Sequence, residues 1–308
     1  MSKNKKLNNA IKNKNDEFYT LLKDVEKELD IHKDFFRDKI VYCNCDNPKF
    51  SNFFKYFFDN FERLQLKELI VSYKEEEQGF YLIYNRSNKE LKLKKLEENG
   101  DFRSDECIDL LKKSDIVVTN PPFSLFKEFI NLLLEEKKYF LIIGNSNALS
   151  FKKILENIKA NKIRLGINCV RWFFSPNGDL CEGARSFWYT NLDIKQKYQR
   201  LNVSKSYSTT KYLEYDNYKA IEISKTKDIP YDFEGIMGVP ITFLSKYNPE
   251  QFEIIGADYQ VKDGELSHIA NKEWKGKLDR AYLNGKRLYS RIFIKNIISS
   301  KKIEDAAV

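Results

Sequence analysis

The first half of the chain alternates between short apolar runs and stretches in which apolar residues recur every three or four positions. Short β-branched or other apolar runs predict buried strands, and the recurring stretches predict amphipathic helices. The predicted strands cover residues 39–43, 68–73, 115–119 and 139–143, and residues 79–84 with 91–96 predict a hairpin or further strands. This alternation, from residue 40 to about 155, predicts an α/β fold with a doubly wound, mainly parallel sheet.

The clearest predicted helix follows the first strand and carries an aromatic stripe at helical spacing: Phe50, Phe53, Phe54, Phe57, Phe58 and Phe61. We interpret that stripe as core. Asn47 is placed to cap the helix and Pro48 to occupy its first turn. Because the free amides and dipole of a helix N-terminus attract a carboxylate or phosphate, Asp46, Asn47 and Ser51 are candidate ligand-binding residues.

The tetrapeptide Asn120-Pro121-Pro122-Phe123 directly follows the apolar run 115–119. Since proline cannot continue a sheet ladder, it is expected at the carboxyl end of a strand, where open α/β sheets bind ligands. The Asn120 side-chain oxygen and the Pro121 carbonyl can accept both hydrogens of an exocyclic amine such as adenine N6, which leaves its lone pair able to attack a methyl group. Phe123 can stack on a base that has been flipped out of a duplex. The alternative is that the prolines only form a turn.

Beyond about residue 160 the apolar runs become shorter, as at 185–189 and 220–223, and polar, tyrosine-rich loops separate them. We expect a first domain at 1–160 and a second, α+β region at 161–308 that packs on the first and supplies some scaffold strands. Trp172 and Trp188 are interpreted as core residues.

The net charge of +8 is unevenly distributed, because residues 267–302 hold ten Lys or Arg against two acidic residues, with aromatic residues between them. Basic side chains bind phosphates and aromatic rings stack on bases, so this stretch is a candidate DNA-facing region; a solvated surface is the alternative. The candidate DNA contacts are Arg171, Arg185, Lys286, Arg287 and Arg291.

Composition also limits the classes of protein. No apolar stretch approaches the length of a membrane span, and residues 1–15 hold no hydrophobic segment, so we expect a cytoplasmic location. Five cysteines and only two histidines argue against a disulfide framework and against zinc, and we expect no metal.

Several segments together resemble the EcoRI-type adenine-specific DNA methyltransferases, within the wider amino-methyltransferase family. They are Asn15-Asp16-Glu17-Phe18-Tyr19-Thr20, Cys45-Asp46-Asn47-Pro48, Ser51-Asn52-Phe53-Phe54-Lys55-Tyr56-Phe57, Gly100-Asp101-Phe102, Asn120-Pro121-Pro122-Phe123, Gly238-Val239-Pro240-Ile241-Thr242-Phe243-Leu244 and Arg291-Ile292-Phe293-Ile294-Lys295. The resemblance covers most of the chain.

The resemblance implies a Rossmann-like fold, S-adenosylmethionine as methyl donor, and adenine N6 in double-stranded DNA as acceptor. The first domain would bind the cofactor and catalyse the transfer, and the second would recognise the target. Phe18, Tyr19 and Thr20 would lie near the methionine end of the cofactor, and Asp101 with Phe102 would hold its adenine. It further implies a bacterial cytoplasmic enzyme and a possible restriction endonuclease acting on the same site without a stable complex.

Two segments depart from the pattern of relatives. The first βα turn, residues 43–48, has no glycine, and the second strand ends in Val71-Ser72-Tyr73 rather than in an acidic residue that binds ribose; Glu75, Glu76 and Glu77 remain open for that role. Two other functions stay open at this point. One is methylation of RNA or of a protein glutamine, and the other is a catalytically silent, DNA-binding relative.

Overall fold

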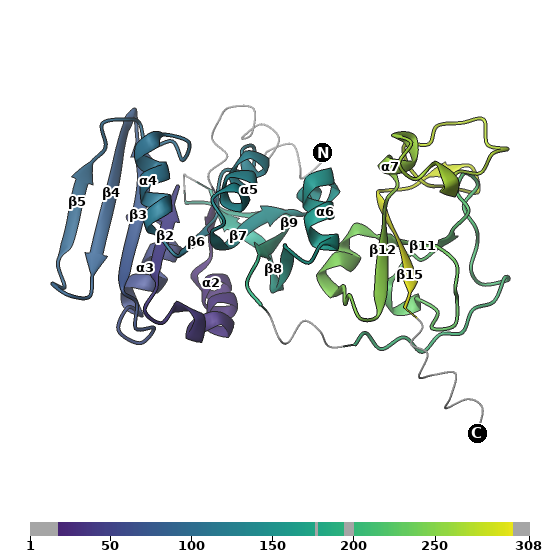
Figure 1. Cartoon of the computed structure of the whole chain (residues 1–308), viewed down its shortest axis with the longest axis horizontal. Coiled ribbons are helices and arrows are strands. Elements are labelled where there is room, and N and C mark those ends of the chain that lie inside the picture. Colours follow the sequence, from purple (N-terminus) through teal and green to yellow (C-terminus); the bar gives the residue numbers. More distant parts are fainter. Residues whose placement is uncertain (1–17, 176–177, 194–199, 298–308) are drawn as a thin grey trace, which may run out of the picture. The chain divides into compact units, whose positions relative to one another are not determined.

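The computed structural model describes residues 18–175, 178–193 and 200–297. These residues form two compact units, one from 18–148 with 162–193 and the other from 149–161 with 200–297. Figure 1 labels their helices and strands. The predicted domain boundary at residue 160 differs from this division, because residues 162–193 complete the sheet of the first unit.

The first unit is built from β1 (Tyr19–Thr20), α2 (Leu22–Leu29), η1 (Asp30–Phe36), β2 (Ile40–Asn44), α3 (Asn52–Asp59), β3 (Glu68–Glu75), β4 (Gln78–Asn85), β5 (Leu91–Lys95), α4 (Asp105–Lys113), β6 (Ile116–Thr119), α5 (Phe126–Glu135), β7 (Tyr139–Asn145), β8 (Arg164–Phe174) and β9 (Leu180–Thr190). A 3₁₀ helix, η2 (Ser146–Ser150), follows β7.

The strands of the first unit form one nine-stranded sheet in the order β1-β8-β9-β7-β6-β2-β3-β4-β5. The central strands β7, β6, β2 and β3 are parallel to one another. The other five pairings are antiparallel. Strands β3, β4 and β5 form successive hairpins toward one edge, and β7, β9, β8 and β1 pair antiparallel toward the other. The α/β prediction is confirmed, and the expectation of a mainly parallel sheet is corrected to a mixed sheet with a parallel centre.

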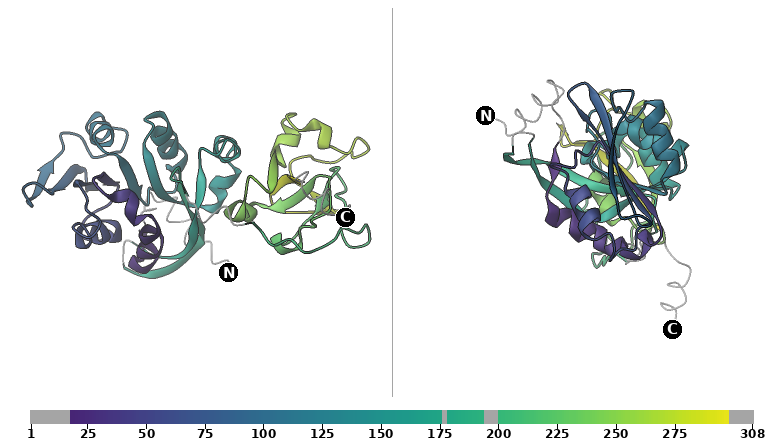
Figure 2. Two further views of the ribbon diagram at one scale, coloured as in Figure 1. Left: turned by 60° about the horizontal axis from the view of Figure 1, so that its bottom comes forward. Right: turned by 90° about the vertical axis from the view of Figure 1, so that its left-hand side faces the viewer.

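Helices cover both faces of this sheet, with α2 and α3 on one side and α4 and α5 on the other (Figure 2). Alternate strand residues point to opposite faces. Val41 and Cys43 therefore pack in one buried cluster with Phe53 and Phe57 of α3. Tyr42, between Val41 and Cys43, points to the opposite face, where its hydroxyl shares a hydrogen bond with the Ser72 hydroxyl (2.7 Å). The parallel strands β2, β3, β6 and β7 are largely buried, and because they run in the same direction their carboxyl ends lie at one edge of the sheet.

Helix α3 begins later than the sequence predicts. Its N-cap is Ser51, whose Oγ accepts a hydrogen bond from Phe54 N (3.1 Å). Asn47 closes the turn before the helix, since its Oδ1 accepts from Lys49 N (3.0 Å) and its carbonyl accepts from Ser51 N (2.8 Å). Pro48 therefore precedes the helix instead of occupying its first turn.

The aromatic stripe is core only in part. Phe53, Phe57 and Phe61 are buried, as predicted, but Phe50 is 60% exposed and Phe58 is 38% exposed. The late start of α3 explains Phe50, because that residue lies in the turn before the helix and does not share its inward face.

A buried carboxylate connects α2 to an irregular part of β8. The register of β8 and β9 shifts between Leu165 and Cys169. Glu28, which is 0% exposed, accepts from Ile167 N (2.9 Å), Asn168 N (2.8 Å) and Asn168 Nδ2 (2.8 Å). These bonds satisfy amides that the shift removes from the sheet ladder.

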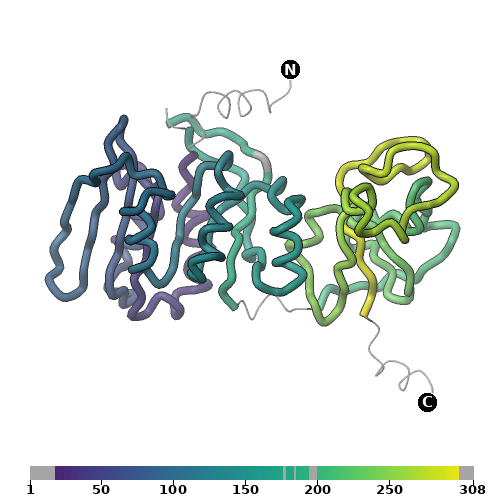
Figure 3. The backbone as a smooth tube through the Cα atoms, turned by 45° about the horizontal axis from the view of Figure 1, so that its top comes forward, coloured from purple at the N-terminus to yellow at the C-terminus, as the bar shows by residue number. Residues whose placement is uncertain are grey.

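The second unit is α+β. Its elements are α6 (Lys152–Lys159), β10 (Ile221–Glu222), η4 (Thr226–Asp228), β11 (Met237–Pro240), η5 (Ile241–Lys246), β12 (Phe252–Ala257), α7 (Tyr259–Lys262), η6 (Ser267–Ile269), β13 (Tyr282–Leu283), β14 (Lys286–Arg287) and β15 (Arg291–Asn296). Four strands form a sheet in the order β10-β11-β15-β12, and β13 pairs with β14 in a separate ribbon. Figure 3 follows the backbone excursion that leaves β12, carries this ribbon and returns in β15.

Candidate active site

The predicted catalytic loop follows β6 at the carboxyl edge of the parallel strands. Thr119 ends β6, and Asn44 ends the neighbouring parallel strand β2. The Thr119 hydroxyl lies in hydrogen-bond contact with the Asn44 carbonyl and the Asp46 carboxylate. These contacts hold the loop after β2 against the loop after β6, so two separate segments of sequence meet in one site.

Asp46 organises the turn after β2. It is 4% exposed, and its other carboxylate oxygen accepts from Ser51 Oγ (2.8 Å), the residue that caps α3. Cys45 before it has a φ of 60°, in the left-handed region that glycine adopts most readily. The turn thus reaches a glycine-like backbone conformation although its sequence contains no glycine.

Asn120 presents an acceptor at the loop. Its Nδ2 donates to the carbonyl of Phe18, and its Oδ1 is buried without a hydrogen-bond partner in the described part of the chain. Buried polar atoms are normally satisfied, so this oxygen is suited to receive a donor from a ligand. The Phe18 carbonyl fixes which end of the amide faces the site, and the adjacent Pro121 is buried.

The aromatic ring of Phe123, in the same loop, packs against two other rings. The ring of Phe123 stacks on Phe18, with centroids 6.3 Å apart and planes at 21°, and meets Phe173 edge to face at 5.9 Å. Phe173, from β8, was not predicted as a site residue. Strand β1 pairs with β8 so that Thr20 lies opposite Phe173, and this pairing brings Phe173 to the loop.

A cavity of about 160 Å³ lies beside the predicted catalytic loop, with Pro122 in its wall. Phe102 is 3% exposed and packs edge to face on Phe129 at 5.1 Å. The Asp101 carboxylate accepts from Arg103 Nε (2.9 Å), and that bond lowers the pKa of Asp101. The cavity is lined by Cys45, Asn47, Tyr73, Lys74, Asn99, Gly100, Asp101, Phe102, Pro122 and Leu125.

A second, narrower hollow shares Cys45 with the first. Its lining residues are Phe18, Tyr19, Thr20, Cys45, Asp46, Ser51, Asn52, Phe53 and Asn120. The structure therefore brings all eight predicted cofactor-binding residues to two adjoining hollows beside Asn120. S-adenosylmethionine is a nucleoside joined to an amino acid, so its site requires apolar surface together with carboxylates, amides and hydroxyls. The residues that line the two hollows supply these groups and therefore fit this cofactor.

The three glutamates left open for ribose binding do not line either hollow. Glu75 ends β3 and pairs with Lys49 (2.6 Å) on the surface. Tyr73 and Lys74, which precede these glutamates in β3, line the larger cavity instead. Strand β3 continues beyond them into its hairpin with β4.

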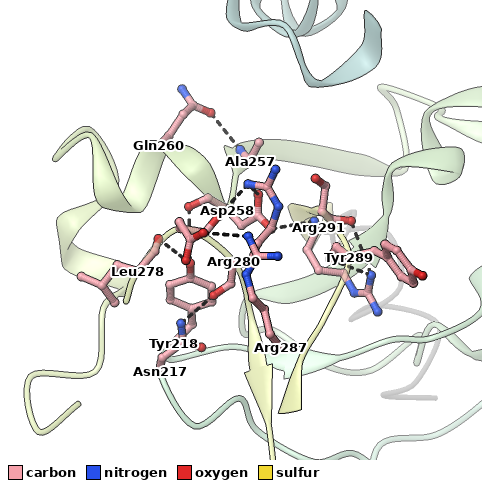
Figure 4. Close-up of polar contacts among 12 residues, drawn as sticks. Asn217, Tyr218, Ala257, Asp258, Gln260, Leu278, Arg280, Arg287, Tyr289 and Arg291 are labelled. Carbon is pink, nitrogen blue, oxygen red and sulfur yellow. Dashed lines mark hydrogen bonds and ion pairs between the residues drawn. The ribbon is translucent and has the colours of Figure 1, made fainter. Parts of the chain in front are cut away.

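The candidate DNA contacts have different surroundings. Arg171, Arg185 and Lys286 are exposed, and exposed Arg287 pairs with Asp279 (2.7 Å). Arg291 is 9% exposed, and Figure 4 shows it within the polar network at the start of β15.

The guanidinium of Arg291 donates to both carboxylate oxygens of Glu222, at 2.9 and 2.8 Å. Because this ion pair is buried, we correct the interpretation of Arg291 from a DNA contact to a structural residue. The interpretation of the two tryptophans also changes in part: Trp188 is fully buried, but Trp172 is 42% exposed.

Within residues 18–175, 178–193 and 200–297, no group of three or more His, Cys, Asp or Glu side chains is arranged to hold a metal ion. Over the same part of the chain, no helix has the length and apolar character needed to cross a membrane.

Comparison with known proteins identifies the family. The family described as "Adenine-specific methyltransferase EcoRI" matches residues 6–297. Type II methyltransferase M.EcoRI of Escherichia coli is 44% identical, with 95% of this chain and 97% of that protein covered. Type II methyltransferases M.MgeORF184P of Mycoplasma genitalium and M.MpnI of Mycoplasma pneumoniae are 39% and 37% identical; each match covers 94% of this chain, and 98% and 97% of those proteins. No solved structure matches the chain significantly. The chain belongs to the EcoRI family of adenine-specific DNA methyltransferases.

Proposed function

We propose that this DNA adenine methyltransferase uses the Asn120 loop to transfer a methyl group to N6 of an adenine flipped out of duplex DNA. The observation that carries the proposal is the buried Asn120 Oδ1, which has no hydrogen-bond partner among residues 18–175, 178–193 and 200–297, while its Nδ2 is held by the Phe18 carbonyl. An acceptor fixed in this way receives an amino hydrogen without reorganising during the reaction.

The chemistry of the acceptor amine explains the loop. The N6 lone pair of adenine is delocalised into the ring, so the amine is a weak nucleophile. Asn120 Oδ1 and the Pro121 carbonyl would accept its two hydrogens and favour a pyramidal nitrogen. Phe123, already supported by Phe18 and Phe173, would brace the flipped base by stacking. The amino proton can leave after transfer, so the loop needs no general base.

When bound, S-adenosylmethionine supplies the electrophilic methyl group on its sulfonium. We assign its adenine to the cavity of Asp101 and Phe102, and its methionine portion to the hollow of Phe18, Tyr19, Thr20 and Ser51. Asp46 supports the second hollow, because its carboxylate holds both Ser51 and Thr119. Asn47 would contact the cofactor from the rim of the larger cavity.

The substrate under this proposal is double-stranded DNA in the bacterial cytoplasm, without a metal ion. The first unit would carry the cofactor and catalytic residues, and the second would contribute target recognition. Arg171 and Arg185 of the β8–β9 hairpin, with Lys286 and Arg287, remain the proposed DNA contacts. A restriction endonuclease acting on the same site would need no stable complex with this enzyme, because both would recognise the DNA alone.

The test is transfer of label from methyl-labelled S-adenosylmethionine to mixed-sequence duplex DNA, with RNA and a glutamine peptide as competing substrates. After digestion to nucleosides, the label is expected in N6-methyl-2′-deoxyadenosine from duplex DNA. Label in RNA or peptide alone, or cofactor binding measured by calorimetry without any transfer, would contradict the proposal.

A further inference from the structure

The β13–β14 ribbon of the second unit projects from the excursion between β12 and β15. Its two turn residues, Asn284 and Gly285, have φ values of 50° and 74°, as in a type I′ hairpin turn. A Cβ added to Gly285 would meet nothing within 4 Å, and residues 284–287 are all exposed. The side-chain positions at the tip of the ribbon are therefore accessible.

A carboxylate clamps the tip in its turn conformation. Asp216 Oδ1 accepts from Asn284 N (3.1 Å) and Oδ2 accepts from Gly285 N (2.8 Å). The Asp216 amide in turn donates to the Tyr282 carbonyl (2.9 Å). One residue thus satisfies both turn amides and a strand carbonyl, which restricts the ribbon to one geometry.

The next two residues fix the base of the ribbon. Asn217 is 0% exposed; its Oδ1 accepts from Tyr282 N (2.9 Å) and its Nδ2 donates to the Arg280 carbonyl (2.8 Å). Tyr218 donates its hydroxyl hydrogen to the Leu278 carbonyl (2.8 Å). Figure 4 shows Asn217 and Tyr218 directed toward this segment. We call residues 216–218 the staple.

The stapled segment is positively charged. Residues 272–287 contain six Lys or Arg and two acidic residues. Arg280 NH1 lies 3.6 Å from Asp258 Oδ1, a carboxylate that is 0% exposed and accepts from Arg291 N (3.0 Å). Tyr289, which is 90% exposed, follows the ribbon. A buried carboxylate therefore orients the base of the segment, while its tip carries exposed Lys286 and exposed Arg287, the latter paired with Asp279.

We propose that the β13–β14 ribbon enters the major groove of duplex DNA and reads the methylation site, and that the staple positions it. The proposal rests on the proposed function of the protein. The major groove admits a two-stranded ribbon, and Asn, Lys and Arg are the side chains that pair with base edges there. A rigid tip carrying Asn284, Lys286 and Arg287 matches both requirements, and its net positive charge complements the phosphates.

Two variants at one position test the geometry without changing charge. Gly285→Asn tolerates the positive φ, whereas Gly285→Val is strained there. With a duplex containing the methylated site mapped in cells, Gly285→Asn should retain kcat/KM within about twofold. Gly285→Val should lose about tenfold or more of its selectivity for the duplex with the site over a duplex that lacks it. A loss of this size corresponds to the loss of one base-reading contact. Cofactor affinity should be unchanged in both.

Charge variants test the contact itself. Lys286→Ala combined with Arg287→Ala should lower kcat/KM about tenfold or more and reduce the salt dependence of DNA binding, while the exposed Lys227→Ala control should not. Asn217→Ala should reproduce the loss of selectivity through positioning alone. Wild-type selectivity in both Gly285→Val and the double variant would overturn the ribbon proposal. Absence of any methylation by the wild type would instead overturn the proposed function.

Discussion

Replacing Glu28 by alanine should destabilise the first unit by removing the acceptor for three hydrogen bonds. The carboxylate is 0% exposed and receives Ile167 N, Asn168 N and Asn168 Nδ2 at 2.8–2.9 Å. These donors lie where β8 departs from its register with β9, so no strand carbonyl can replace the lost oxygen atoms.

The magnitude follows from the two backbone amides. A buried donor left unsatisfied costs about 1–3 kcal/mol, and part of each amide can reach water because the Ile167 side chain is exposed. We therefore expect Glu28→Ala to reduce the free energy of unfolding by about 2–4 kcal/mol. Glu28→Gln should lose roughly half as much, since its amide keeps one acceptor oxygen but turns a donor toward Asn168.

Urea denaturation followed by circular dichroism measures these losses, with hydrogen exchange at Ile167 and Asn168 as a local probe. The control is Glu26→Ala, an exposed residue on the same helix, which should change stability by less than about 0.5 kcal/mol. If Glu28→Ala and Glu26→Ala were equally stable, the carboxylate would not be holding the irregular segment of β8.

Two further predictions concern packing and pH. Gly166→Ala should destabilise the first unit by about 1–3 kcal/mol in the same denaturation assay, because its Cβ would lie 2.2 Å from Glu28 Oε1 and 2.6 Å from Trp188 Cβ; unchanged stability would contradict that packing. Burial raises the pKa of Asp258 to about 6, so the stability associated with its neutral form is present below about pH 4 and lost as pH rises through 6. Asp258→Asn should remove this dependence, and the stability difference between variant and wild type should change by about 2.4 kcal/mol between pH 4 and 7. A difference independent of pH would contradict the burial of an ionising carboxyl.

The sequence alone predicted where residues 120–123 lie, because its signals are local. An apolar run ending in two prolines has few other uses than a strand end, and the loop indeed follows β6. The same reasoning failed for the start of α3, where both Asn47 and Ser51 are good capping residues. In the structure Ser51 is the cap, and its Oγ also donates to the Asp46 carboxylate, which Thr119 of β6 contacts from a distant part of the sequence.

Features that depend on long-range pairing were beyond prediction. Phe173 reaches Phe123 of the proposed catalytic loop through the pairing of β8 with β1 at the sheet edge. A one-residue difference along the same strand separates buried Phe173 from exposed Trp172. Likewise, the basic residues of 267–302 appear equivalent in sequence, yet Arg291 is neutralised by buried Glu222 whereas Lys286 stands at an exposed tip.

The most direct test of the central claim is the single-turnover rate of methyl transfer to adenine N6 by Asn120→Ala, measured beside the affinity for S-adenosylmethionine. Removing the buried Oδ1 acceptor should lower the rate by about 10²–10³-fold and leave cofactor affinity within about threefold, because loss of one preorganised polar contact acts on the transition state. Asn88→Ala, in an exposed turn, is the control and should keep the wild-type rate. A wild-type rate in Asn120→Ala would contradict the assignment of this loop as the site of amine methylation.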